Sequence, residues 1–356
     1  MLQENTTVTK LLKVDRDMPD PGAIREAASV IQSGGLVAFP TETVYGLGAN
    51  GLYPPAVRKI FEVKGRPQDN PLILHVSSRQ QARELSEGLS DMATTLIDKF
   101  WPGPLTVVAK KHPSIPVEVT AGHPTVALRM PDCPVALALI SASGVPIAAP
   151  SANTSGRPSP VTAQQVLEDL GGRIGCVLDA GPTGIGVEST VIDTTGQVCV
   201  ILRPGGVTRE QLEQVLGAGR VRHFLEGDRL ASPGMKHTHY APRSEMWVVE
   251  GDTDAVVREI KRLSEERRRG GHRVGILATN QTRQHYTADV VLSLGDRDDL
   301  SEIARNLYTC LRQFDSHKIN VILAEGFPRE GLGEAICDRL HRASGGRVLQ
   351  AGEDLS

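Results

Sequence analysis

The stretch KGRPQDNPLILHV, residues 64–76, decides how the rest of the chain is interpreted. It places two cations, two amides, two prolines and a histidine around an apolar run that is typical of a strand. If the segment is extended, Lys64 and Arg66 project from the same face, and Gly65 lets the backbone come close to a ligand. This arrangement suits an anion such as a polyphosphate, although a solvated basic turn before a strand explains it equally well.

Composition and charge limit the classes of protein that this chain can belong to. Its 356 residues suggest two domains or one large domain. An apolar fraction of 40% and a charged fraction of 23% are ordinary for a globular protein. The net charge of -3 gives no overall attraction to nucleic acid or acidic membranes, so an anion site must come from a local cluster of Lys and Arg.

Cysteine usage and hydropathy point to a compartment. The five cysteines are scattered and include no CxxC pair, which argues against a zinc ribbon or a disulfide framework and fits a reducing environment. The N-terminal residues MLQENTTVTKLLKVD lack the apolar core of a signal peptide, and no apolar run approaches the length of a membrane span. We therefore expect a cytoplasmic protein that does not enter a membrane.

Periodicity in the first half predicts a series of helices and strands. The helices are expected over 21–34, 54–63, 79–100, 163–172 and 208–217, and the strands over 36–40, 105–111, 125–131, 145–150, 176–181, 190–196 and 198–207. The loop 182–190 is rich in glycine but matches neither the P-loop nor the dinucleotide-binding spacing. A nucleotide would therefore need another architecture.

Polar loops follow two of these strands. LVAFP (36–40) runs into PTETVYGLG (40–48), and VPIAAP (145–150) runs into SANTSGRPSP (151–160). Loops after strands commonly carry binding sites, and hydroxyls, amides and backbone N–H groups in such loops bind phosphate or sugar. The same side chains also satisfy local backbone groups or cap a following helix, so the pattern leaves both interpretations open.

A change of pattern separates the two halves. Residues 219–243 show no periodicity and many turn residues, which is typical of a linker. His237 and His239 within it have no nearby carboxylate or thiol that would complete a metal site. From residue 245 strands alternate with helices, which predicts a small parallel-sheet α/β domain without a glycine fingerprint. Glu325 and Arg329, near the end of one strand, are the candidates for a site there.

Seven stretches, taken in order, carry a resemblance to a known family: PTETVYGLG, KGRPQDNPLILHV, FWPGPLT, VALRMP, APSANTSGRPSP, GVESTVID and ILRPGG. They resemble the YrdC-like family of threonylcarbamoyl-AMP synthases, and PGMKHTHYAP resembles the linker of the family's long two-domain form. The resemblance implies an α/β fold. A YrdC-like twisted mixed-sheet domain with an open cavity would span 1–218, a linker or lid 219–243, and a smaller parallel-sheet, Rossmann-like domain 244–356.

The resemblance also implies an activity and assigns residues to it. The family makes threonylcarbamoyl-AMP and pyrophosphate from L-threonine, bicarbonate and ATP, for the threonylcarbamoyladenosine (t6A) modification of tRNA. Threonine contacts are implied for Thr43, His75, Arg129, Ala149 and Ser189. ATP contacts are implied for Arg66, Asn70, Thr125, Ser151, Asn153, Ser159, Arg203 and Tyr240, and catalytic roles for Lys64 and Arg66.

The implied reaction needs positioning and charge rather than an enzyme nucleophile. Cations must offset the charge that grows on the leaving pyrophosphate, which suits Lys64, Arg66 and Arg203, and another must hold the threonine carboxylate, which suits Arg129. Mg²⁺ is expected with ATP. Because few Asp or Glu residues lie in the motifs, we expect the ion to sit on the phosphates with water ligands, without a metal site of the protein or an organic prosthetic group.

Other classes of function compete with this one. An RNA-binding module without catalysis is disfavoured by the acidic net charge and by an aromatic content of 4%, so we expect no stable nucleic-acid binding. A carbamoyl-transfer domain of the hydrogenase-maturation type would bring cysteine pairs that this chain lacks. A purely structural scaffold does not account for polar motifs at strand ends. The expected partners are threonine, bicarbonate, ATP and a downstream threonylcarbamoyl-transferase machinery that acts on tRNA.

Overall fold

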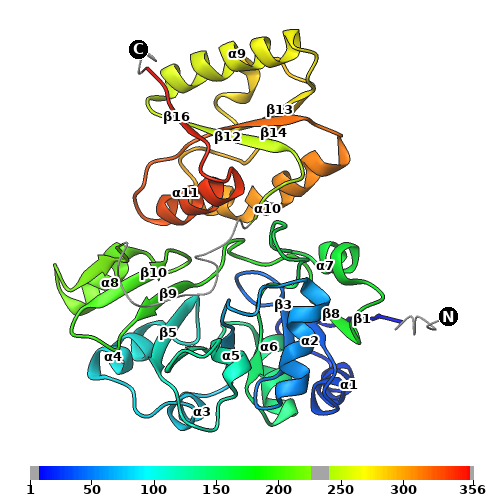
Figure 1. The fold of residues 1–356 in the computed structure, drawn as a ribbon, viewed down its shortest axis with the longest axis vertical. Coiled ribbons are helices and arrows are strands. Elements are labelled where there is room, and N and C mark those ends of the chain that lie inside the picture. The colour runs from blue at the N-terminus through cyan, green and yellow to red at the C-terminus, as the bar shows by residue number, and fades with distance from the viewer. Residues whose placement is uncertain (1–7, 226–239, 353–356) are drawn as a thin grey trace. The chain divides into compact units, whose positions relative to one another are not determined.

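The computed structural model describes residues 8–225 and 240–352, which form two compact units (Figure 1). Of these residues, 8–155 and 159–225 belong to the first unit, and 156–158 and 240–352 belong to the second. Most of the expected linker, including His237 and His239, lies outside the described residues. No helix within the described ranges has the length and hydropathy needed to cross a membrane.

One mixed sheet organises the first unit, in the order β1-β8-β2-β3-β7-β4-β6-β5-β9-β10-β11. Its strands are β1 (Lys10–Lys13), β2 (Val37–Phe39), β3 (Gly46–Asn50), β4 (Ile73–His75), β5 (Leu105–Lys110), β6 (Thr125–Arg129), β7 (Ile147–Ala148), β8 (Cys176–Asp179), β9 (Thr190–Asp193), β10 (Cys199–Arg203) and β11 (Val221–His223). Its helices are α1 (Pro21–Gln32), α2 (Pro54–Lys64), α3 (Arg79–Glu84), α4 (Asp91–Phe100), α5 (Val117–Thr120), α6 (Pro134–Ser143), α7 (Ala163–Leu170) and α8 (Arg209–Leu216).

Helices cover the two faces of this sheet unevenly. On one face a large apolar core joins α2 and α4, through Ile60 and Leu96, to strand residues such as Leu74 and Leu128. On the other face α1 and α6 pack over β2 and β8. Farther along that second face, a small cluster consists of strand residues: Ile73, Val108, Ala127, Val191, Val200 and Leu202. Because strand side chains alternate between faces, His75 and Arg129 share this side with Ile73 and Ala127.

A parallel sheet in the order β14-β13-β15-β12-β16 forms the second unit. Its elements are β12 (Glu245–Glu250), α9 (Thr253–Arg269), β13 (Val274–Ala278), η1 (Arg283–His285), β14 (Val290–Ser293), α10 (Leu300–Ser316), β15 (Val321–Glu325), α11 (Leu332–Ala343) and β16 (Val348–Gln350). The predicted α/β fold class, a mixed-sheet unit followed by a smaller parallel-sheet unit, is confirmed.

The stretch 64–76 is not extended at residues 64–66, although the prediction that Lys64 and Arg66 share one face required an extended backbone there. Lys64 is the last residue of α2, and Gly65 caps this helix in the left-handed conformation, with φ of 62°. A strand begins only at Ile73. The predicted arrangement of Lys64 and Arg66 on one face of a strand is therefore wrong, because glycine ends the helix between them.

Other boundaries also differ from the predictions. The helix expected over 79–100 is two helices, because the Ser90 side chain caps a new one by accepting from the Ala93 N–H at 3.1 Å. β11 occupies the start of the expected linker and pairs in parallel with β10. The short strands β1 and β16 were not predicted, since each is defined by its partner strand and not by a pattern of its own.

Candidate active site

Arg129, at the end of β6, lies at the centre of a buried polar cluster. The residue is 4% exposed, and its Nη2 donates to Glu42 Oε1 at 2.6 Å and to Thr43 Oγ1 at 3.0 Å. Its Nε donates to the Gly103 carbonyl at 3.4 Å. Glu42 Oε2 is buried and has no hydrogen-bond partner within the described residues. The cluster thus pairs a cation with a carboxylate that retains an unused acceptor.

The loop between β2 and β3 presents Glu42 and Thr43 to Arg129. The hydroxyls of Thr41 and Thr43 lie 2.8 Å apart, which links the two ends of a tight turn. The carbonyl of Glu42 accepts a hydrogen bond from the N–H of Ile185 at 2.8 Å, so the glycine-rich loop 182–190 helps to hold this turn in place. The motif PTETVYGLG therefore folds as a polar turn whose side chains also reach the site.

His75, at the end of β4, lies beside Arg129 in the parallel register of β4 and β6. Burial, reinforced by the positive charge of Arg129, lowers the pKa of His75 to about 3, so the ring is neutral at physiological pH. Its Nδ1 is buried without a partner in the described part of the chain. Phe39 packs edge-on against the ring, at a centroid distance of 6.1 Å. A neutral imidazole held in this way can form a hydrogen bond with a substrate hydroxyl.

Ser189, one residue before β9, connects neighbouring strands. Its Oγ lies 2.8 Å from Thr106 Oγ1 of β5. Arg203, at the end of β10, donates from Nη2 to the Ser189 carbonyl at 2.8 Å and to its Oγ at 3.3 Å. Ser159 Oγ donates to Glu188 Oε1 at 2.5 Å, and both residues are buried. These contacts fix three of the predicted residues around the segment 188–189.

Two cations order the loops that the resemblance assigns to the nucleotide. Lys64 is 2% exposed, and its Nζ donates to the carbonyls of Ser151 and Asn153. Ser151 Oγ donates to Asn153 Oδ1 at 2.5 Å. Arg66 donates from Nε to the Asn70 carbonyl at 3.2 Å and from Nη2 to the Pro71 carbonyl at 3.0 Å. Both side chains therefore hold backbone carbonyls of these loops in place. This structural role was not part of the prediction that they bind phosphate.

The predicted residues of the first unit lie on β4, β6 and β10, at the end of α2, and in loops beside β3, β4, β7 and β9. These strands belong to one run of neighbours in the sheet, β3-β7-β4-β6-β5-β9-β10. Direct hydrogen bonds join Thr43 to Arg129, Ser189 to Arg203, and Lys64 to Ser151 and Asn153. Ala149 follows β7, and its N–H donates to the Ile73 carbonyl at 2.9 Å. Thr125 begins β6 on the same face as Arg129.

Tyr240 belongs to the second unit. It is 6% exposed and has a positive φ of 65°. Its ring stacks on Tyr308 at a centroid distance of 5.3 Å, and the guanidinium of Arg339 lies 5.3 Å from its centre. In this structure Tyr240 is thus a packed aromatic residue, and its contact with the nucleotide stays a prediction.

Sequence reasoning missed three polar residues that touch the predicted ones: the buried Thr106 and Glu188, and Glu42, whose side chain is 13% exposed. Glu42 and Glu188 stand inside quoted motifs, next to Thr43 and Ser189, so a carboxylate within such a motif was the available signal. Thr106 alternates with apolar residues in a strand and gave no signal. Within the described ranges, no group of three or more His, Cys, Asp or Glu side chains could hold a metal ion.

Comparisons with known proteins cover nearly the whole chain. A family model described as "Telomere recombination" matches residues 29–205, and one described as "Threonylcarbamoyl-AMP synthase, C-terminal domain" matches residues 207–345. The chain is 49% identical to the threonylcarbamoyl-AMP synthase of Bacillus subtilis, over 92% of this chain and 94% of the relative. It is also 49% identical to that of Pyrococcus abyssi, over 94% and 98%. The solved structure of P. abyssi Sua5 complexed with L-threonine superposes with a TM-score of 0.91 at 48% identity, covering 96% of this chain and 100% of that one.

Proposed function

The chain belongs to the threonylcarbamoyl-AMP synthase family, in its form with a Sua5-type C-terminal domain, and from this premise we propose how its residues perform the reaction. It is a nucleotidyltransferase that makes threonylcarbamoyl-AMP for the t6A modification of tRNA. The observation that carries the assignment of roles is the buried Arg129 cluster, with its unused Glu42 oxygen and its neutral His75.

Threonine binds, in this proposal, around Arg129. The guanidinium holds the carboxylate of the amino acid by charge-assisted hydrogen bonds. The unused Oε2 of Glu42 accepts an N–H of the threonine amine, and Glu42 Oε1 keeps Arg129 in place. His75, Thr43 and Ser189 offer neutral partners for the threonine hydroxyl, and Ala149 flanks the amino acid through its backbone. A site built to bond a hydroxyl discriminates strongly against an analogue without one, so alanine should be a poor substrate.

The nucleotide binds along the adjoining loops. Ser151, Asn153 and Ser159 would contact the phosphates and the sugar. The other residues of this site would be Arg66, Asn70, Thr125 and Arg203. Tyr240, which belongs to the second unit, would also approach the nucleotide. Arg66 and Arg203 would offset charge on the pyrophosphate as it leaves. Lys64 would act from the position in which it braces the loop 151–153, so its charge is fixed before ATP arrives.

The bond changes follow from these positions. The threonine amine, in its neutral form, attacks the carbon of CO₂ and forms a carbamate, losing one proton to solvent or to Glu42. When bicarbonate is the source, a C–O bond of bicarbonate breaks instead, and the departing hydroxide takes the amine proton and leaves as water. A carbamate oxygen then attacks the α-phosphorus of ATP, and the bond to the β-phosphate oxygen breaks, which releases pyrophosphate. Each step gains from fixed orientation and from exclusion of water, because the carbamate is labile.

MgATP is the substrate form that we propose. In this proposal the phosphates and water hold the Mg²⁺, because few Asp or Glu residues lie in the motifs. We also propose that the protein works in the cytoplasm and passes its product to a threonylcarbamoyl-transferase machinery, without stable binding of tRNA. The division into 1–218, 219–243 and 244–356 is likewise a proposal, with β11 at the start of its middle segment.

Mass spectrometry of the product tests this function directly. The purified chain, incubated with MgATP, L-threonine and bicarbonate, should yield threonylcarbamoyl-AMP and pyrophosphate in equal amounts. Omitting threonine or bicarbonate should abolish both products. Formation of AMP or ADP that does not depend on threonine would contradict the proposal, and tRNA binding without any product would favour the RNA-binding alternative.

A further inference from the structure

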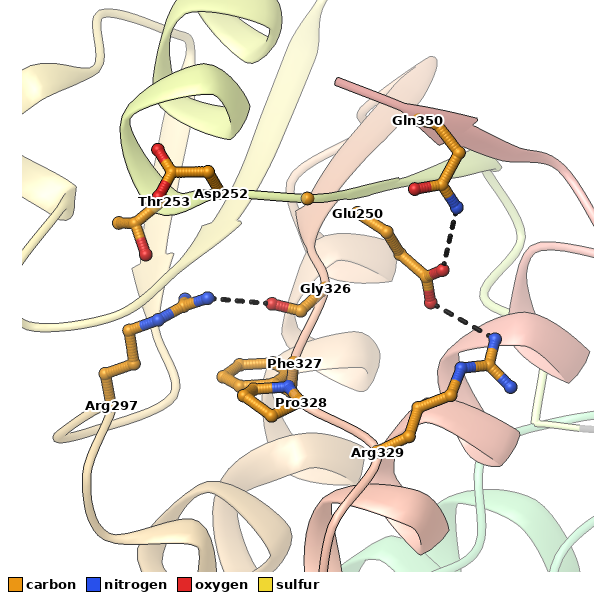
Figure 2. Close-up of a pocket in the computed structure, with 10 residues that line it drawn as sticks. Glu250, Asp252, Thr253, Arg297, Gly326, Phe327, Pro328, Arg329 and Gln350 are labelled. Atoms are coloured by element: carbon orange, nitrogen blue, oxygen red, sulfur yellow. Dashed lines mark hydrogen bonds and ion pairs between the residues drawn. The ribbon is translucent and has the colours of Figure 1, made fainter. Parts of the chain in front are cut away.

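A cavity of about 400 Å³ lies in the second unit, and none of its lining residues is used by the proposed reaction (Figure 2). It is lined by residues 250–253 after β12 and 326–329 after β15, together with Arg297 and Gln350. Its volume is in the range of natural small-molecule sites. Arg329, which we predicted from the sequence to lie near a strand end, is one of its lining residues.

The cavity occupies the switch point of the parallel sheet. From β12 the chain passes through α9 to β13, whereas from the adjacent β15 it passes through α11 to β16, in the opposite direction across the sheet. Right-handed crossovers then place α9 and α11 on opposite faces, as Figure 1 shows. The loops after β12 and β15 diverge, and a crevice opens between them at the carboxyl ends of the strands. Open α/β sheets bind their ligands at this position.

Two arginines supply positive charge on opposite sides of the cavity. Arg297 is held by Glu325, at 3.2 Å from Oε2, and donates from Nη2 to the Gly326 carbonyl at 3.2 Å. Its side chain is 17% exposed, so the guanidinium is fixed before any ligand binds. The Arg329 side chain is 59% exposed, and its Nη2 lies 3.4 Å from Glu250 Oε1 and 3.3 Å from both ring nitrogens of His341.

Two carboxylates balance these arginines. Glu250 Oε1 lies 2.7 Å from His341 Nε2, and its Oε2 accepts from Gln350 Nε2 at 3.1 Å. Burial opposes ionisation of Glu250, but the hydrogen bonds from His341 and Gln350 outweigh it and lower the pKa of this carboxyl. Asp252 is exposed and caps α9 by accepting the N–H of Asp254 at 3.0 Å. The four charged lining residues sum to zero formal charge.

This chemistry disfavours a nucleotide. An α/β sheet would place a phosphate at the start of α9, but Asp252 and Asp254 bring two negative charges to that helix end. Phe327 is 6% exposed, and the Arg297 guanidinium lies 5.3 Å from its ring centre, so no aromatic face is free to stack a base. A compact ligand that carries one positive and one negative charge matches the charged lining residues better.

We propose that this cavity binds a free α-amino acid. Arg297 and Arg329 would hold the carboxylate, and Glu250 and Asp252 would hold the ammonium group, with the rest of the volume available for the side chain. Such a site would let the second unit respond to an amino acid while the first unit performs the chemistry. The ligand is defined by its paired opposite charges, which a simple carboxylate, an amine or a nucleotide does not offer.

Calorimetric titration of the full chain tests the proposal. Each of the proteinogenic L-amino acids is titrated separately, with acetate and AMP as comparison ligands. Two variants probe the walls: Asp252→Asn, which removes a charge but keeps a good helix cap, and Arg329→Ala, at an exposed position. The control is Arg262→Ala, an exposed arginine on α9 whose partners Glu259 and Glu266 belong to the same helix.

At least one amino acid should bind at one site per chain, or at two sites if it is threonine, which also occupies the catalytic site. Asp252→Asn and Arg329→Ala should each weaken the cavity site by roughly tenfold to a hundredfold, and Arg262→Ala should not. The proposal fails if only catalytic-site threonine binding is seen, if the two wall variants bind as wild type does, or if acetate or AMP binds this site as tightly as the amino acid.

Discussion

Single residues decide how the proposed threonine site works, and Glu42 is the one that the motifs alone did not reveal. Its carboxylate both holds Arg129 and retains a buried oxygen without a partner among the described residues. Removing its charge while keeping its shape leaves a buried cation less well compensated and takes away an acceptor for the amine. Such losses at a charged group are worth about 1.5–3 kcal/mol.

We therefore predict that Glu42→Gln raises KM for threonine and lowers kcat/KM by about ten- to a hundredfold, while KM for ATP changes little. Arg129→Lys should behave similarly, because lysine cannot reach Glu42 and Thr43 with one planar group. Steady-state kinetics with each substrate varied provides the measurement. The matched control is Arg58→Lys, which alters an exposed pair with Glu118. Unchanged threonine kinetics in Glu42→Gln would remove this residue from the site.

His75 makes a second prediction, about stability. Its pKa is about 3 in the folded protein, and its ordinary value is 6.5, so the unfolded chain binds the proton more readily. The contribution of the neutral, buried His75 to the free energy of unfolding is therefore present above pH 6.5 and is lost as the pH falls from there toward 3. The expected loss is about 1.4 kcal/mol at pH 5.5 relative to neutral pH.

Urea unfolding at pH 7.5 and 5.5 measures this effect. The difference in unfolding free energy between the two pH values should be smaller in His75→Asn than in the wild type. His112→Asn, at an exposed position in the same unit, should keep the wild-type difference. Equal pH dependence in all three proteins would show that His75 does not titrate as its burial demands.

Elements show where prediction from sequence succeeds. Helices with clear caps, such as α1 and α8, were predicted within two residues of their ends, because the signals lie within the segment itself. Strands of three or four residues, such as β1 and β16, carry no such signal and depend on a distant partner. The candidate site divides in the same way: the motifs name its residues within single segments, whereas the Glu42–Arg129 pair joins a loop and a strand that lie far apart in sequence.

The end of α2 gives a prediction at this scale. Gly65 has φ of 62° and an open environment around the position where a Cβ would stand. Gly65→Ala should therefore destabilise through backbone strain alone, by about 1–2 kcal/mol, and displace the neighbouring Arg66. Thermal unfolding combined with KM for ATP measures both effects. Gly196→Ala is the control, because Gly196 is equally unobstructed but has no positive φ. A stable variant with normal ATP kinetics would contradict the need for a left-handed cap.

The whole molecule raises the question of why a second unit accompanies the catalytic one. Tyr240 follows the part of the chain that the structure does not describe and is packed between Tyr308 and Arg339. The family resemblance implies that 219–243 is a linker or lid, and we propose the lid, with Tyr240 approaching the nucleotide. In that case the second unit anchors the far end of the lid.

Tyr240→Ala should then reduce product formation more than it reduces threonine binding, because an open lid admits water to the carbamate. Tyr240→Phe, which keeps the stacking on Tyr308, is the matched comparison and should retain more activity. Product formation by mass spectrometry and threonine binding by calorimetry separate the two effects. Full product formation in Tyr240→Ala would leave the segment as a connector only.

The pairing of β1 with β8 has a consequence for synthesis on the ribosome. Lys10 pairs with Cys176, so the first strand cannot find its neighbour until that part of the chain has emerged. At usual elongation rates the delay is roughly ten to thirty seconds. During this interval a nascent chain exposes unpaired strand edges. β9, which follows Ser189, and β10, which ends at Arg203, emerge later still. Translation speed and chaperone contact over this window should therefore govern how much active enzyme a cell obtains from each message.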